Sequence, residues 1–226
     1  MRPFPFAIVG FDLDGTLLDT RADLGAAINH ALGLAGRPPV PVEQVERFIG
    51  GGSRLMLARA LAETGPVPDA EHDALYAELL AFYEANIAVH TALYPGGAAM
   101  LDALDARGVA LAVVTNKLET LAVKVLAELG LSDRFACVIG GDTLGPGRAK
   151  PAPDLLHEMV ARCAARGIAG RAAFVGDTTY DTHAARAAEM PCVAVSFGFN
   201  DRPARELGAD AVIDHFEQLV LALERL

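Results

Sequence analysis

The chain alternates short apolar runs with longer segments in which apolar residues recur at helical spacing. The short runs predict buried β-strands and the longer segments predict helices. The predicted strands are Ala7–Phe11, Val109–Val114, Phe135–Ile139, Ala172–Val175, Cys192–Ser196 and Ala211–Ile213. The predicted helices are Ala98–Arg107, Glu119–Leu129, Asp154–Arg166, a segment that follows Asp177 and runs to about Glu189, and Phe216–Arg225. Because strands and helices alternate, we expect an α/β fold with a doubly wound, mostly parallel sheet.

Residues 20–90 interrupt this alternation, because nearly all of them are expected to be helical. Glycines and prolines divide this segment into four predicted helices. These are Arg21–Leu34, Val42–Phe48, Arg54–Thr64 and a helix from Asp69 to about Val89. The predicted domain division therefore assigns residues 1–19 and 93–226 to the α/β core and residues 20–92, the helical insert, to a second domain.

The first apolar run ends in two aspartates, Asp12 and Asp14, and Gly15 then allows a sharp turn. Two carboxylates this close repel each other, so the site favours a cation or a shared proton. In an open α/β sheet, ligands bind outside the carboxyl ends of the strands. The pair therefore predicts a metal-assisted acid site at the end of the first strand.

Three further polar clusters follow predicted strands: Thr115-Asn116, Lys150, and Asp177 with Asp181. In this architecture all four clusters can converge on one rim of the sheet. Two carboxylate pairs, a hydroxyl and a lysine at one rim indicate phosphoryl transfer. We therefore expect Thr115, Asn116 and Lys150 to bind the substrate.

A phosphate monoester is an anion and resists attack by a carboxylate. A divalent cation held by Asp12 and Asp177 neutralises both the phosphate and the attacking carboxylate. Asp181 can orient the metal or its waters. Hard oxygen ligands suit Mg²⁺, which is the expected cofactor.

Each catalytic group then has a chemical role. Asp12 can attack phosphorus and form an aspartyl phosphate. Asp14 can protonate the leaving oxygen and later deprotonate the hydrolytic water. The Thr115 hydroxyl can hold phosphate oxygens, and Lys150 supplies positive charge.

The motifs Phe11-Asp12-Leu13-Asp14-Gly15-Thr16, Thr115-Asn116, Lys150-Pro151 and Gly176-Asp177-x-x-x-Asp181 occur in this order. Together they resemble the four motifs of the haloacid dehalogenase superfamily, over essentially the whole chain. The resemblance implies a Rossmann-like core, an all-helical cap inserted after the first strand, and Mg²⁺-dependent phosphatase activity. It also implies that the metal takes the backbone carbonyl of Asp14.

Looser motifs resemble the phosphoglycolate phosphatases: Phe48-Ile49-Gly50-Gly51-Gly52, Leu93-Tyr94-Pro95-Gly96, Val114-Thr115-Asn116-Lys117, Ile139-Gly140-Gly141-Asp142 and Ser196-Phe197-Gly198-Phe199-Asn200. This resemblance implies a phosphoric monoester hydrolase that converts 2-phosphoglycolate to glycolate and phosphate.

Two features of the insert are candidates for contact with the substrate. The loop containing Gly51 either faces the substrate or is an ordinary linker between helices. Arg54 is a candidate for binding a second anionic group. For Lys117, the default expectation is a solvated lysine.

The net charge of −10 argues against nucleic acid as the main partner. The expected cap is too small to admit a protein substrate easily, so we expect the partner to be a small phosphorylated metabolite. The three cysteines, widely spaced, form neither a disulfide framework nor a zinc motif, which favours a reducing cytoplasm. We see neither a signal peptide nor a membrane span. For the oligomeric state, the sequence is compatible with a monomer and with a homodimer.

Individual residues also argue for or against other functions of this fold. A haloacid dehalogenase needs no acid at position 14, and a phosphonatase uses a cap lysine, which residues 20–92 lack. A sugar-phosphate mutase stays an alternative, because its core motifs can look the same. From another class, a non-enzymatic phosphoacceptor would keep Asp12 phosphorylated as a switch, and Asp14 argues against it.

Overall fold

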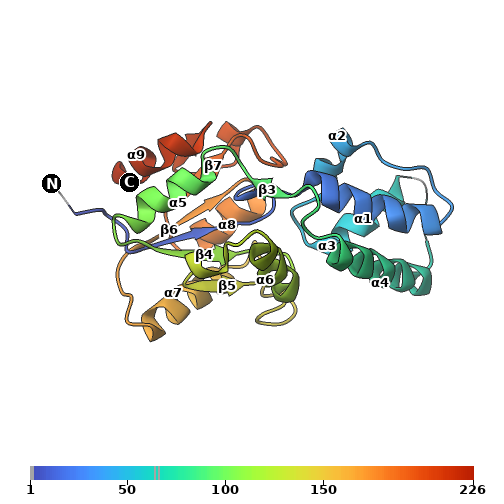
Figure 1. Cartoon of the computed structure of the whole chain (residues 1–226), viewed down its shortest axis with the longest axis horizontal. Coiled ribbons are helices and arrows are strands. Elements are labelled where there is room, and N and C mark those ends of the chain that lie inside the picture. The colour runs from blue at the N-terminus through green and yellow to red at the C-terminus, as the bar shows by residue number, and fades with distance from the viewer. Residues whose placement is uncertain (1–2, 64, 66) are drawn as a thin grey trace.

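The computed structural model describes residues 3–63, 65 and 67–226. Its centre is a six-stranded sheet in the order β5-β4-β1-β6-β7-β8, and every strand pair is parallel (Figure 1). The strands are β1 (Ile8–Phe11), β4 (Ala110–Val114), β5 (Cys137–Ile139), β6 (Ala172–Gly176), β7 (Cys192–Val195) and β8 (Ala211–Ile213). The predicted α/β fold is confirmed, with the first strand at the middle of the sheet.

Helices cover both faces of the sheet, because alternate strand residues point to opposite sides. On β1, Ile8 packs into one apolar cluster, while Val9 and Phe11 pack into the other. The first face is covered by α7 (Asp154–Ala165) and α8 (Thr179–Ala187), and the second by α5 (Gly97–Asp105), α6 (Glu119–Glu128) and α9 (Leu219–Glu224). Short 3₁₀ helices are η2 (Ser132–Arg134), η3 (Ala204–Glu206) and η4 (Phe216–Gln218).

The helical insert lies to one side of the sheet (Figure 1). Its elements are α1 (Arg21–Leu34), α2 (Val42–Val45), the 3₁₀ helix η1 (Glu46–Phe48), α3 (Ser53–Ala62) and α4 (Asp69–Ala85). Buried leucines such as Leu32, Leu57 and Leu79 hold these helices together. The end of the predicted helix Arg54–Thr64 falls outside the described residues. The helix from Asp69 ends four residues earlier than expected, at Ala85, where Asn86 donates its side-chain amide to the carbonyl of Phe82.

Two crossings join the insert to the sheet. The short strands β2 (Leu18–Asp19) and β3 (Ala92–Leu93), which we did not predict, pair antiparallel there. Beside them, the buried Asp23 carboxylate accepts hydrogen bonds from the backbone N–H groups of His90 and Thr91 and from the Thr91 hydroxyl. The first turn of α1 is thereby tied to the returning chain.

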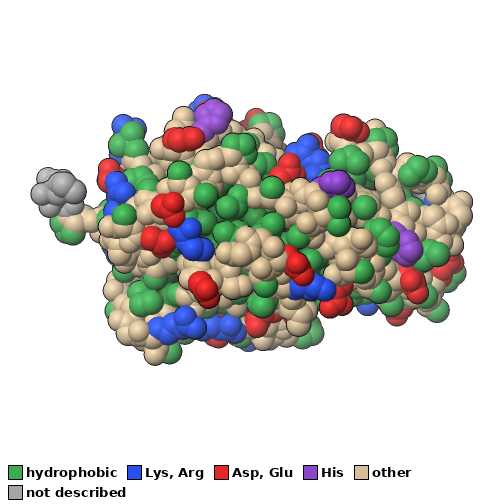
Figure 2. Space-filling view, in the orientation of Figure 1, with side chains coloured by type: hydrophobic (Ala, Val, Ile, Leu, Met, Phe, Trp, Pro, Cys, Tyr) green, Lys and Arg blue, Asp and Glu red, His purple; other side chains and the backbone are tan. Residues whose placement is uncertain are grey.

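Charged side chains of both signs lie on the face shown in Figure 2, where acidic and basic groups are interspersed. Among the described residues, no helix combines the length and the apolar character needed to cross a membrane.

Candidate active site

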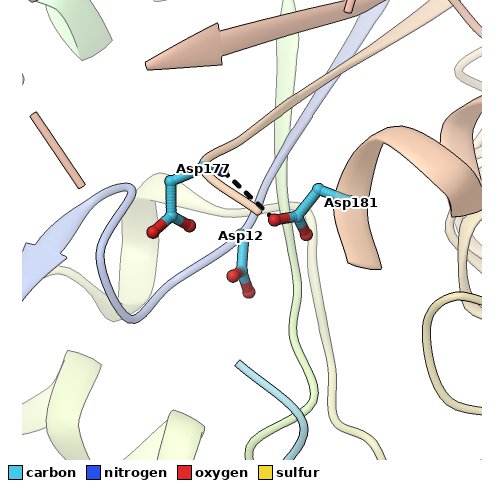
Figure 3. A group of neighbouring side chains, drawn as sticks. All are labelled: Asp12, Asp177 and Asp181. Atoms are coloured by element: carbon cyan, nitrogen blue, oxygen red, sulfur yellow. Dashed lines mark hydrogen bonds between the residues drawn. The ribbon is translucent and has the colours of Figure 1, made fainter. Parts of the chain in front are cut away.

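The predicted acid residues meet at the carboxyl ends of the central strands. Asp12 follows β1, Asp177 follows β6, and Asp181 lies in the first turn of α8. Figure 3 shows their carboxylates facing a common space. One oxygen of each lies within 4.8 Å of the others, close enough for a single metal ion, and all three residues are buried.

Lys150 is a cation that pairs with two members of this group, Asp12 and Asp181. Its Nζ lies 2.9 Å from Asp12 Oδ1 and 2.6 Å from Asp181 Oδ1, and it donates to the carbonyl of Val114. Burial alone lowers the pKa of Lys150, but the charges of Asp12 and Asp181 raise it above its ordinary value. Lys150 therefore stays protonated and positively charged beside Asp12 and Asp181.

One lysine does not balance three aspartates. Burial raises the pKa of Asp12 from 3.8 to about 6, although Lys150 opposes the rise. Burial, together with the charges of Asp181 and Asp12, raises the pKa of Asp177 well above its ordinary value. Asp12 Oδ1 is buried and makes no hydrogen bond of good geometry. Excess buried negative charge on hard oxygen donors fits a divalent cation.

Asp177 is oriented by its immediate surroundings. Its Oδ1 accepts from the Thr16 hydroxyl at 2.9 Å and its Oδ2 accepts from the Phe199 N–H at 2.7 Å. Gly15 has φ +84° and Gly198 packs against it, and a Cβ at either position would collide with the Asp177 carboxylate. Small residues are therefore required around this carboxylate.

Asp181 is held more tightly than its neighbours. Its Oδ2 accepts from the N–H groups of Asp177 and Thr178 and from the Thr178 hydroxyl, which completes a capping box at the start of α8. With Oδ1 bonded to Lys150 and Oδ2 to the Asp177 N–H, this carboxylate also links two other members of the site.

Asp14 has a partner, Lys117, that we did not predict from the sequence. Lys117 Nζ donates to both Asp14 oxygens, at 2.9 Å each, and its side chain is only 5% exposed, so the expectation of a solvated lysine is wrong. Burial by itself lowers the pKa of Lys117, but the Asp14 charge and Tyr83 outweigh this effect and raise the pKa above its ordinary value. One signal was available: the chain has only three lysines, and this one directly follows Thr115-Asn116.

Thr115 and Asn116 lie beside these groups. The buried Thr115 hydroxyl accepts from the Lys117 N–H. The Asn116 side-chain amide donates to two carbonyls, that of Gly50 in the insert and that of Lys150 in the core. The Asn116 side chain therefore joins the insert to the strand ends.

A cavity of about 40 Å³ lies between the insert and the strand ends. Its lining includes Asp12, Asp14, Thr115, Asn116 and Lys117 from the core, and Gly50, Gly52, Met56, Leu79 and Tyr83 from the insert.

Gly51 and Arg54 line a neighbouring groove instead, together with Tyr76. The Arg54 guanidinium pairs with Asp73 and lies over the Tyr76 ring, at 4.4 Å from the ring centroid. The structure thus brings Asp12, Asp14, Thr115 and Asn116 to one cavity, with Lys150, Asp177 and Asp181 packed against it, and leaves Gly51 and Arg54 outside it.

Residues 9–195 match the family model of the haloacid dehalogenase-like hydrolases. The chain is 43% identical over 225 residues to the phosphoglycolate phosphatase of Agrobacterium fabrum, covering 98% of this chain and 94% of that protein. It is 42% identical over 211 residues to the phosphoglycolate phosphatase of Caulobacter vibrioides, covering 93% and 87%.

A solved structure is also similar. The crystal structure of a predicted phosphoglycolate phosphatase from Haemophilus somnus superposes with a TM-score of 0.86 at 29% identity, covering 96% of this chain and 97% of that one. Similarity therefore extends over both the sheet and the helical insert.

Proposed function

Because the chain belongs to the haloacid dehalogenase-like hydrolases and is a phosphoric monoester hydrolase, we propose that it cleaves small phosphate monoesters through an aspartyl phosphate on Asp12. The observation that carries this mechanism is the buried group of Asp12, Asp177 and Asp181 beside a small cavity, with Lys150 paired to Asp12 and Asp181.

The metal is proposed to be Mg²⁺. Asp12, Asp177 and the backbone carbonyl of Asp14 would hold it, and Asp181 would orient its surroundings. When bound, Mg²⁺ supplies positive charge that reduces the repulsion between a carboxylate nucleophile and a phosphate.

In the first half-reaction, an Asp12 oxygen forms a bond to phosphorus while the bond from phosphorus to the ester oxygen breaks. Asp14 gives that ester oxygen a proton, and the alcohol leaves. Lys150 orients Asp12 and offsets the charge of the transferred group, and the Thr115 hydroxyl binds a phosphate oxygen.

In the second half-reaction, Asp14 takes a proton from a water that attacks phosphorus, which releases phosphate and restores the Asp12 carboxylate. Asp14 lines the cavity, as general acid–base catalysis requires. Lys117 fixes both of its oxygens and therefore its orientation.

We propose 2-phosphoglycolate as the substrate, because similar proteins over nearly the full chain are named for that activity. Residues 20–92 would act as the cap over a core formed by residues 1–19 and 93–226. A cytoplasmic location is supported by three free thiols.

The test is phosphate release from a panel of small monoesters, 2-phosphoglycolate among them, with Mg²⁺ and with excess chelator. We expect turnover with the metal and a loss of more than about a thousandfold in Asp12→Asn, since a carboxamide cannot act as the nucleophile. Retained turnover in a folded Asp12→Asn variant would refute the nucleophile assignment. Transfer of phosphate to a second hydroxyl instead of water would indicate a mutase, and a long-lived phosphoryl protein would indicate a switch.

A further inference from the structure

The cavity is poor in positive charge. Of the described residues that line it, only Lys117 carries a cationic side chain, and most of the contribution from the insert is apolar, including Leu24, Met56 and Leu79. Lys150 pairs with Asp12, the proposed acceptor of the phosphoryl group. A charged group on the rest of the substrate therefore has one cation available to it, Lys117.

Lys117 is equipped to bind a further anion. An ammonium group has three N–H donors, and the hydrogen bonds to the Asp14 oxygens use two of them. The Tyr83 ring from α4 covers the ammonium, with its centroid 4.5 Å from Nζ. With Asp14 in the protonated state that the proposed acid step requires, the charge of Lys117 is not compensated by that carboxyl. In these buried surroundings the charge is weakly screened, so an anionic partner interacts with it strongly.

The position of Lys117 also limits the length of the substrate. Asp14 is the proposed proton donor to the ester oxygen, and Lys117 Nζ is 2.9 Å from the Asp14 carboxylate. An anion in contact with Lys117 must therefore lie only a few bonds from that ester oxygen. The small volume of the cavity, about 40 Å³, favours the same short spacing.

We propose that Lys117 binds a carboxylate on the leaving-group side of the substrate, so that the enzyme selects short phosphate monoesters with a carboxylate near the ester oxygen. This inference rests on the proposed phosphatase function and adds a specificity residue to it. It replaces Arg54, whose guanidinium is paired with Asp73 in the neighbouring groove.

The experiment compares kcat/KM for 2-phosphoglycolate with kcat/KM for 2-hydroxyethyl phosphate, which has a neutral hydroxymethyl group in place of the carboxylate. The wild-type protein is expected to prefer the carboxylate. In Lys117→Met this preference falls by roughly 10- to 100-fold, the range for a hydrogen bond to a charged group, mainly through KM for 2-phosphoglycolate.

The matched control is Lys124→Met. Lys124 lies on α6 outside the cavity, with its side chain 37% exposed and 3.8 Å from Glu84. This variant is expected to keep the wild-type preference. Lys117→Gln, which leaves Asp14 a hydrogen-bond donor, is expected to lose the preference as Lys117→Met does, and it serves where the methionine variant folds poorly.

Three outcomes would overturn the inference. One is an equal loss on both substrates in the Lys117 variants, since that would limit Lys117 to orienting Asp14. The second is loss of the preference in Arg54→Ala with retention in Lys117→Met. The third is a wild-type protein that shows no preference for 2-phosphoglycolate over 2-hydroxyethyl phosphate, a result that can be obtained without any variant. In all three the protein still hydrolyses monoesters, whereas failure of the proposed function would appear as no hydrolysis of either substrate.

Discussion

Removing the metal should make the stability of this protein depend on pH in one direction. In the folded chain the pKa of Asp12 is raised from 3.8 to about 6 and that of Asp177 is raised well above its ordinary value, in both cases chiefly by burial. Without a cation the folded state therefore keeps protons that the unfolded chain releases. Stability is then greatest below about pH 4 as far as these groups are concerned, and it falls as pH rises through 6 and beyond.

The size of the effect follows from the shift on Asp12 alone. A rise of about two pH units corresponds to roughly 3 kcal/mol of stability lost once the group is ionised, at 1.36 kcal/mol per unit. For a chain of this size, each kcal/mol changes Tm by roughly 2–4 °C, so the whole titration of Asp12 predicts a fall of about 6–12 °C, of which roughly half lies between pH 5 and pH 8. Asp177 acts in the same direction. Mg²⁺ binds the ionised carboxylates, so its stabilising effect should be larger at pH 8 than at pH 5.

The assay is thermal unfolding from pH 5 to pH 8 in excess chelator, with and without added Mg²⁺, at matched ionic strength. The Asp12→Asn variant is the control, since it removes one titrating group and should show a weaker pH dependence without metal. A metal-free wild-type Tm that is constant or rises over this range, or a stabilisation by Mg²⁺ that is no larger at pH 8 than at pH 5, would contradict the reasoning.

Three other substitutions test the supports of the site. Asp23→Ala leaves buried donors such as the Thr91 N–H and hydroxyl without a partner and should cost about 2–4 kcal/mol in a denaturant titration, and a cost under 1 kcal/mol would contradict this account of the crossing. Gly15→Ala places a methyl group against the Asp177 carboxylate at φ +84° and should lower kcat at least about tenfold, whereas Gly33→Ala, with open space around it, should not. Asn116→Ala removes the amide contact to Gly50 of the insert, together with the one to Lys150 of the core, and should lower kcat/KM roughly tenfold in steady-state assays, so an unchanged value would exclude a role in holding the insert.

Much of the fold was predictable because its signals are local. Strands such as β1 and β6 are short apolar runs that end abruptly in polar residues, and that pattern needs no knowledge of distant contacts. The two-residue strands β2 and β3 carry no such signal, because they exist only where the chain crosses between insert and sheet. The early end of α4 at Ala85 depends on a single asparagine side chain.

For the site, the sequence alone determined which residue types follow which strands, and hence that Asp12, Asp14 and Asp177 lie at one edge of a parallel sheet. Only the tertiary structure decided which charged side chains pair with one another. Lys117 is buried against Asp14, and Arg54 is held by Asp73 away from the cavity. The physical reason is that the position of each strand along the chain follows from local patterning. The charge partner of Lys117, in contrast, lies 103 positions away and is set by how the elements pack. The packing thus placed the cavity's cation at Lys117, which the sequence alone would have left in solvent.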